Sequence, residues 1–153
     1  MFTASVSRRG FCSAATLAGL AATPFAQATE PAEPAETKPI LVHTPELAGR
    51  PPDGKATGSR LWTLHKTAQS RTNLVEMRGE VGLHKHPDAA HSLYVIRGEV
   101  EVMAGDLKTT LQPGDYISIP AGVPHRYKTP IDAPALLLSM DAPPYDPAKT
   151  VRL

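Results

Sequence analysis

The chain has 153 residues, which leaves room for one domain once any targeting segment is set aside. Its 16 basic and 15 acidic residues nearly balance, so the charge gives no reason to expect binding to nucleic acid or to an anionic membrane. With 16 prolines and 5% aromatic residues, the composition favours a β domain with many turns and an aliphatic core.

The first 28 residues resemble a twin-arginine export signal. Arg8 and Arg9 precede an apolar, alanine-rich run over residues 14–26, and the run ends in a small-x-small cleavage pattern. We expect cleavage after Ala28 and a periplasmic mature protein. The alternatives are a chance arginine pair or an uncleaved anchor, but the run is shorter than the ~20 residues of a membrane span. We therefore expect no membrane contact after cleavage.

Residues 29–58 predict a Pro-rich linker followed by an N-terminal arm. The stretch 29–39, TEPAEPAETKP, has no apolar face to bury and indicates a disordered or polyproline-like spacer. From Ile40 to Gly58 a few apolar residues are interrupted by prolines and glycines. We expect this arm to pack along the domain that follows or along a neighbouring subunit of a homodimer. The only cysteine, Cys12, lies in the predicted signal, so the mature protein would have no disulfide.

Residues 59–140 alternate short apolar runs with turn residues, a pattern typical of an antiparallel sandwich or barrel. No segment has a helical period, so the predicted fold class is all-β. If His91 points inward, Leu93 and Val95 should point inward too. We expect tight hairpins at residues 98–99 and 104–106. The predicted strands are Arg60–Lys66, Asn73–Arg78, Gly82–His86, Ser92–Arg97, Glu99–Ala104, Leu107–Leu111, Tyr116–Ile119, His125–Lys128 and Ala135–Met140.

Four of the six histidines lie in two stretches of this domain. His84 and His86 are two positions apart, which on an extended strand places both rings on one face. His91 opens the next apolar run, and His125 follows the turn sequence PAGVP. Imidazoles that converge in an apolar barrel suit Zn, Cu, Fe and Ni. The sequence therefore predicts a transition-metal site.

These two stretches resemble the two motifs of the cupin family. The first, G-x5-H-x-H-x3-4-E-x6-G, matches from its histidine pair at His84 and His86 to Gly98, and the second, G-x5-P-x-G-x2-H-x3-N, matches from Gly114 to His125.

Three positions depart from these motifs. Gly79 is one position late, Thr129 replaces the closing Asn, and His91 stands where the family usually has Glu. The last departure indicates the four-histidine variant of the site.

The resemblance implies a cupin double-stranded β-helix, or jelly-roll, barrel. It also implies that His84, His86, His91 and His125 bind one divalent transition metal ion, Mn, Fe, Ni, Cu or Zn. The first three would come from one sheet and His125 from the facing strand. One or two open coordination positions would accept a small-molecule ligand or substrate. Because imidazoles leave the charge of the ion intact, an anionic or enolate-like molecule is favoured.

Other residues are weaker candidates. Glu76 is the best candidate for a general base if it points inward, although a solvated outer-face position is the alternative. A tyrosine hydroxyl is another option, but strand parity turns Tyr94 outward. His43 and His65 are interpreted as ordinary polar residues. The remaining tyrosine candidates are Tyr116 and Tyr127, and the predicted barrel lining is Trp62, Leu64, Leu74, Leu83, Met103, Ile117 and Leu138.

Three functions remain open. The first is a dioxygenase-like oxidoreductase that acts on a small molecule with adjacent oxygen functions. The second is an isomerase, decarboxylase or lyase that uses the ion only as a Lewis acid. The third is a non-catalytic module that binds a metal or a small ligand, since a fold does not determine an activity. The tail, residues 141–153, is predicted to be an extended strap without assigned chemistry.

Overall fold

The structure is a computed structural model that describes residues 38–56 and 58–153. The predicted export signal and most of the spacer lie outside the described residues. Among the described residues, no helix has the length and apolar character needed to cross a membrane.

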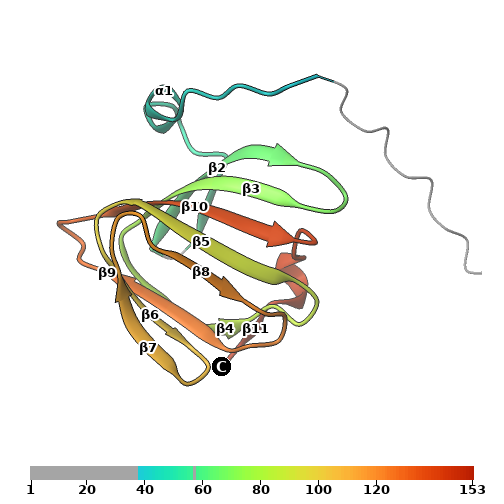
Figure 1. The fold of residues 1–153 in the computed structure, drawn as a ribbon, viewed down its shortest axis with the longest axis vertical. Coiled ribbons are helices and arrows are strands. Elements are labelled where there is room, and N and C mark those ends of the chain that lie inside the picture. Colours follow the sequence, from blue (N-terminus) through green and yellow to red (C-terminus); the bar gives the residue numbers. More distant parts are fainter. Residues whose placement is uncertain (1–37, 57) are drawn as a thin grey trace, which may run out of the picture. The chain divides into compact units, whose positions relative to one another are not determined.

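Two antiparallel sheets face each other and enclose the core (Figure 1). The six-stranded sheet has the order β1 (Gly54–Ala56), β2 (Ser59–Lys66), β3 (Arg71–Met77), β10 (Ala135–Ala142), β5 (Ala90–Arg97) and β8 (Tyr116–Ile119). The five-stranded sheet has the order β11 (Val151–Arg152), β4 (Gly79–Lys85), β9 (His125–Thr129), β6 (Val100–Ala104) and β7 (Leu107–Leu111). This arrangement confirms the predicted all-β jelly-roll barrel.

All nine predicted strands are present, with ends shifted by up to three residues. The two shortest strands, β1 and β11, were not predicted because two or three residues carry too little alternation to stand out. The helix α1 (Thr44–Ala48) was also missed, since five residues are too few for a helical period. A single turn of 3-10 helix, η1 (Pro147–Lys149), is capped by Asp146, whose side chain accepts a hydrogen bond from the Ala148 amide over 2.9 Å.

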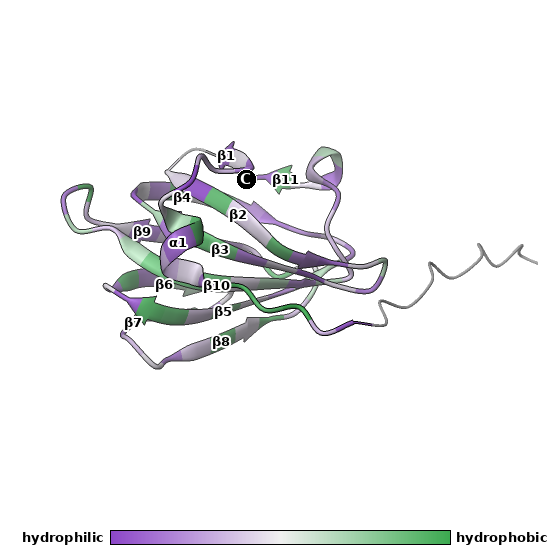
Figure 2. Cartoon of the chain, turned by 90° about the horizontal axis from the view of Figure 1, so that it is seen from above, coloured by the Kyte–Doolittle hydropathy of each residue, from purple (hydrophilic) through white to green (hydrophobic). Residues whose placement is uncertain are grey.

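Side chains alternate along β5 as predicted. His91, Leu93 and Val95 are buried, whereas Tyr94 and Ile96 are exposed. In Figure 2 apolar and polar bands alternate along several strands in the same way. The inward side chains of both sheets form one core, which comprises Val75, Met77, Leu93, Val95, Val100, Val102, Leu111, Ile117, Ile119, Tyr127, Ala135 and Leu137.

The turn at Gly98 differs from the prediction. The sequence predicted a hairpin there, but β5 and β6 belong to different sheets, so the chain crosses the barrel at this point. Gly98 has φ of +79°, and a Cβ on it would lie 2.8 Å from the Cα of Ala135. Only glycine fits such a close crossing. The second predicted hairpin is confirmed, because Gly105 lies in the turn between the paired strands β6 and β7.

Trp62 and Leu74 do not line the barrel, so this part of the predicted lining is wrong. They are cross-strand partners on β2 and β3 and lie on the opposite face from Val75, which belongs to the core. Both are nevertheless fully buried. The indole Nε1 of Trp62 donates a hydrogen bond to the carbonyl of Arg50 in the arm over 3.1 Å, so residues of the arm cover this outer face of the sheet.

Candidate metal centre

The four predicted ligands come from both sheets. His84 on β4 and His125 at the start of β9 are direct cross-strand partners in the five-stranded sheet. His86 follows the end of β4, and His91 lies on β5 in the six-stranded sheet. The expectation that His125 faces the other three is therefore wrong: His91 is the residue that faces the others. The predicted roles of His91 and His125 are therefore exchanged, but the four rings still lie at one end of the barrel.

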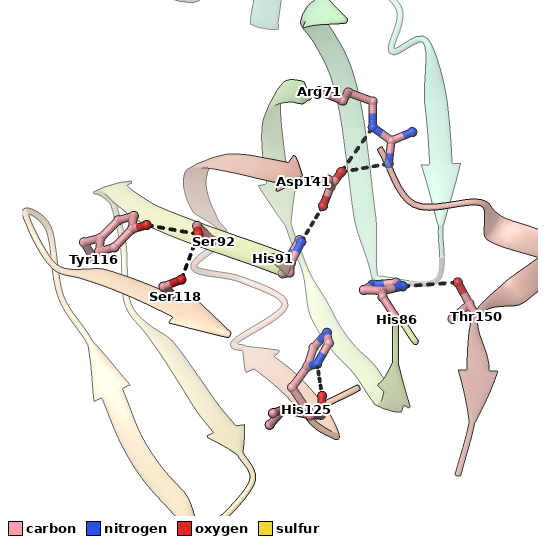
Figure 3. Close-up of polar contacts among 10 residues, drawn as sticks. Arg71, His86, His91, Ser92, Tyr116, Ser118, His125, Asp141 and Thr150 are labelled. Atoms are coloured by element: carbon pink, nitrogen blue, oxygen red, sulfur yellow. Dashed lines mark hydrogen bonds and ion pairs between the residues drawn. The ribbon is translucent and has the colours of Figure 1, made fainter. Parts of the chain in front are cut away.

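The rings lie close together. The ring centroids of His84 and His125 are 4.3 Å apart, and that of His86 lies 5.0 Å from His84 and 5.3 Å from His125. Ligand atoms of these three residues lie within 4.8 Å of one another. The ring of His91 lies 5.7 Å from that of His86 and 5.6 Å from that of His125. Figure 3 shows the rings of His86, His91 and His125 around a common space.

Each ring is held through its Nδ1 atom. Nδ1 of His84 donates to the carbonyl of Gly82 and Nδ1 of His125 to that of Val123, both over 2.8 Å. Nδ1 of His91 donates to Oδ1 of Asp141 over 2.6 Å. Because these three partners only accept, Nδ1 carries the proton and Nε2 carries the lone pair of the neutral ring.

The fourth ring, His86, is held in the same way, but its partner does not fix the tautomer. Its Nδ1 lies 3.3 Å from the hydroxyl of Thr150, which can donate or accept. The outer partners thus leave Nε2 of all four histidines available as ligand atoms, as in histidine sites where a second group orients each ligand.

The chemistry of these donors fits a divalent transition metal ion. Nε2 of His125 is buried without a hydrogen-bond partner, which is costly unless something binds there. Burial lowers the pKa of His125 to about 3 and that of His86 to about 4, and it also lowers the pKa of His84. These three rings are therefore neutral at physiological pH, which is the form that binds a metal.

Asp141 is a site residue that the sequence analysis missed. It is fully buried, and its Oδ2 accepts hydrogen bonds from Nε and Nη2 of Arg71 over 3.1 and 2.8 Å (Figure 3). Burial would raise the pKa of Asp141, but the hydrogen bond from His91 and the guanidinium of Arg71 outweigh it and lower that pKa. The alternation of β10 contained the signal, because Asp141 has the same parity as Leu137 and Ser139, which are also buried.

The tail after Asp141 packs over the site rather than forming a strap without a role. The ring of Tyr145 stacks on His86 at 4.0 Å and 22°, and the guanidinium of Arg71 lies 4.5 Å from the centroid of the same ring. Strand β11 then pairs with β4, where Arg152 is the partner of His84. Further out, Lys149 forms an ion pair of 2.9 Å with Asp88. The tail therefore contacts His86 through both Tyr145 and Thr150.

The other candidates lie apart from the histidines, with one exception. Glu76 lies on the face of β3 away from the core and forms ion pairs with Arg60 at 3.2 Å and Arg78 at 3.0 Å, so it does not reach the site as a base. The hydroxyl of Tyr116 donates to Ser92 on the outer face. The exception is Tyr127, which is 3% exposed and whose ring centroid lies 5.4 Å from that of His125.

A groove in the described part of the chain lies away from the four clustered histidines. This groove, of about 510 Å³, lies between the start of the arm and the outer face of β2 and β3. It contains none of the four clustered histidines and is lined by Lys38, Ile40, Val42, Thr44, Leu64, His65 and Thr72.

Comparison with known proteins agrees with the barrel fold. The cupin domain family matches residues 73–141, and no curated protein matches the chain. An uncharacterized conserved protein with a double-stranded beta-helix domain from Klebsiella pneumoniae is 21% identical, with a TM-score of 0.59, over 75% of this chain and 97% of its own. The protein TT1209 from Thermus thermophilus is 26% identical, with a TM-score of 0.58, over 68% of this chain and 97% of its own.

An oxalate decarboxylase from Lactobacillus farciminis shares the fold over a smaller part of its length. It is 19% identical, with a TM-score of 0.54, over 65% of this chain and 32% of its own. Residues 73–141 therefore match a cupin domain, and the solved structures share its barrel fold. The histidine cluster of this chain, with His84, His86 and His125 nearest to one another, has the composition of a metal site.

Proposed function

We propose that this cupin is a metal-dependent, dioxygenase-like oxidoreductase that acts on a small organic molecule with adjacent oxygen functions. His84, His86, His91 and His125 would hold one divalent transition metal ion, Mn, Fe, Ni, Cu or Zn. The observation that carries this proposal is that every ring uses Nδ1 for a contact within the protein, which leaves Nε2 for a ligand. An ion bound there would polarise substrate oxygens and, if redox-active, would supply the electron transfer that dioxygen chemistry needs.

The charges around the site favour an anionic substrate. The imidazoles bring no negative charge, and the carboxylate of Asp141 is balanced by the guanidinium of Arg71 at 2.8 Å. The protein therefore does not neutralise the positive charge of a divalent ion, and a negatively charged or enolate-like molecule is attracted to it.

The described residues favour oxidation over proton abstraction by the protein. A general base needs a carboxylate or similar group within hydrogen-bonding reach of the substrate. Asp141 is engaged by His91 and Arg71, and Glu76 is engaged by arginines on the other face of its sheet. Neither carboxylate is free to remove a proton in the barrel.

Oxygen uptake tests this function. The metal-reconstituted protein is assayed with enediols and flavonols, and we expect uptake that is lost in His84→Ala and in His125→Ala. The variant His43→Ala is the matched control, because His43 lies in the exposed arm. Equal turnover in all three variants would remove the proposal.

A metal-dependent isomerase, decarboxylase or lyase is the second candidate. The observation that favours it is the hydroxyl of Tyr127, which is buried near the histidines without a partner and can bind a substrate oxygen. This activity would turn over substrate under argon, whereas the oxidoreductase would not. Ligand binding without turnover in either atmosphere would instead indicate a non-catalytic binding cupin.

We also propose that the chain is exported by the twin-arginine route to the periplasm and forms a homodimer. The motif at Arg8 and Arg9 supports the first part. Since that route carries folded proteins, the ion could be inserted before export. The order of affinities that favours Cu and Zn would then not decide which metal is bound. Cell fractionation of Arg8→Lys/Arg9→Lys tests the route, metal analysis of the periplasmic protein tests loading, and light scattering tests the dimer.

A further inference from the structure

The strand registers divide the barrel interior beside the histidines into two layers. In the six-stranded sheet, Asp141 is the partner of both Arg71 and His91. Two positions further into the barrel, Ser139 is the partner of Asn73 and Leu93. The inner residues of this second row therefore lie directly beneath the histidine layer.

The facing sheet has the same two layers. His125 is the partner of His84 and of Ala104, and two positions along the strand Tyr127 is the partner of Val81 and Val102. Tyr127 and Asn73 thus enter the second layer from opposite sheets. Asn73 has the same parity as the core residue Val75, so it points into the barrel.

Tyr127 reaches from its own sheet toward the other one. Its ring centroid lies 5.4 Å from that of His125 and 6.4 Å from that of His84, and only 6.0 Å from that of His91 on the facing sheet. The side chain is 3% exposed, and its hydroxyl has no hydrogen-bond partner. A phenol donor is therefore buried beside three of the proposed metal ligands.

The side-chain amide of Asn73 is also buried without hydrogen-bond partners. The residue is 1% exposed, and neither Oδ1 nor Nδ2 of its amide has a partner. Buried polar groups without partners are rare in folded proteins and call for an explanation. Most of the surrounding second layer is apolar, with Leu93, Ile117 and Val102 buried. Its buried polar neighbour, Ser139, forms no hydrogen bond with Asn73 or Tyr127, because the polar side-chain atoms of both residues have no partner.

We propose that Tyr127 and Asn73 form the polar end of the ligand site beneath the histidines. The ligand is a small molecule with a carbonyl or carboxylate oxygen next to a hydroxyl. The hydroxyl of Tyr127 and Nδ2 of Asn73 donate to the first group, and Oδ1 of Asn73 accepts from the second. This assignment rests on the proposed function, because it places the ligand between the second layer and the histidine Nε2 atoms.

The alternative partner is ordered water, which commonly satisfies buried polar groups. The two explanations predict different effects of removing the phenol oxygen. If the hydroxyl is held for a ligand, Tyr127→Phe removes an unsatisfied group from the free protein and does not lower its stability. If water satisfies the hydroxyl, the same change removes a hydrogen bond and lowers the melting temperature.

The experiment uses the zinc-loaded mature protein, because zinc binds ligands without redox turnover and the result does not depend on oxygen chemistry. The probe is 3-hydroxy-4-pyranone, which has a carbonyl next to a hydroxyl, and the control probe is 4-pyranone, which lacks the hydroxyl. Titration calorimetry measures both affinities in the wild type, in Tyr127→Phe and in Asn73→Leu. Tyr94→Phe is the matched control, since Tyr94 is exposed on the outer face.

We expect Tyr127→Phe and Asn73→Leu each to weaken binding of 3-hydroxy-4-pyranone by roughly three- to tenfold, as the loss of one or two hydrogen bonds predicts. Tyr94→Phe should bind as the wild type does, and zinc affinity and melting temperature should not fall in Tyr127→Phe. Four results would each overturn the assignment. Two concern Tyr127→Phe: a probe affinity equal to that of the wild type, or a lower melting temperature. The other two concern the probes: no preference for the hydroxylated probe, or no binding of either probe. None of these outcomes bears on oxygen uptake, which tests the proposed function separately.

Discussion

His91 donates its Nδ1 hydrogen to Asp141 over 2.6 Å in a part of the barrel where Asp141 is fully buried. The related motif has Glu at the position of His91. In this chain the carboxylate instead belongs to Asp141, which contacts His91 on the side away from the proposed metal position. The carboxylate would not itself bind an ion, but it sets which nitrogen of His91 is available to bind one. Arg71 holds the other carboxylate oxygen, which fixes the orientation of the pair.

Replacing Asp141 by Asn should therefore weaken metal binding although no ligand is removed. The amide can present hydrogens toward Nδ1 and then favours the tautomer with the proton on Nε2. We expect an affinity roughly 10- to 100-fold lower for zinc, the usual cost of removing such an outer partner. Chelator competition measures the affinity. Asp132→Asn, at an exposed turn position, is the control, and an unchanged affinity in Asp141→Asn would show that His91 is not a ligand.

Tyr145 should stabilise the orientation of His86 through its ring rather than its hydroxyl. The ring lies between His86 at 4.0 Å and the guanidinium of Arg71 at 4.5 Å, and such contacts contribute about 0.5–1.5 kcal/mol each. Tyr145→Phe should leave the visible spectrum of the cobalt-loaded protein unchanged. Tyr145→Ala should shift the spectrum and weaken cobalt binding by roughly three- to tenfold. If the Phe variant is as impaired as the Ala variant, the hydroxyl rather than the stack is responsible.

The sequence revealed the histidines but not what surrounds them. The spacing of His84, His86 and His125 within two motifs, together with strand alternation, was enough to predict the fold and the cluster. Asp141 lies on β10, whose alternation contained its signal, whereas the partners Tyr145 and Thr150 lie in the tail after β10, which has no motif of its own. Their contacts depend on where the chain turns after β10 and on the pairing of the two-residue strand β11 with β4, and this long-range pairing leaves no periodic pattern in the sequence.

The same limit explains the wrong assignment of the histidines to sheets. Alternation within a strand shows that His91 and Leu93 share a face. It does not show that β5 pairs with β10 and β8, whereas β4 pairs with β9 and β11. Pairing is decided by the crossings between sheets, such as the one at Gly98, and the sequence indicates a turn there without indicating its partner strands.

His91→Ala should distinguish a four-histidine site from a three-histidine site. The ring of His91 lies 5.7 and 5.6 Å from those of His86 and His125, while the other three rings lie closer together. If His91 is a ligand, the variant should still bind one copper ion, but its electron paramagnetic resonance spectrum should lose the hyperfine pattern of one nitrogen. His84→Ala is the positive control for that loss, and an unchanged spectrum of His91→Ala would establish three histidine ligands.

Gly98→Ala should destabilise the fold through both backbone conformation and crowding. Gly98 has φ of +79°, and a Cβ there would lie 2.8 Å from the Cα of Ala135. Gly114 has φ of +96° but open space around the Cβ position, and Gly82 has neither constraint. We expect a free energy of unfolding lower by about 1 kcal/mol in Gly114→Ala, by more than that in Gly98→Ala, and little change in Gly82→Ala. Urea denaturation measures the series, and equal effects at positions 98 and 114 would rule out crowding.

The metal-free protein should lose stability as the pH falls below the pKa of its unfolded histidines. An unfolded histidine has a pKa of about 6.5, whereas burial lowers the pKa of His86 to about 4 and that of His125 to about 3. Between these values the unfolded chain binds protons that the folded chain does not, so acid favours unfolding. The free energy of unfolding is at its full value above pH 6.5 and decreases toward pH 4, by up to about 1.4 kcal/mol per pH unit for each histidine.

Urea denaturation from pH 8 to 4 in the presence of chelator measures the slope of the free energy of unfolding against pH. This slope should flatten in His86→Gln/His125→Gln but not in His43→Gln, a change in the exposed arm. A slope that survives the double substitution would mean that other groups dominate the acid sensitivity.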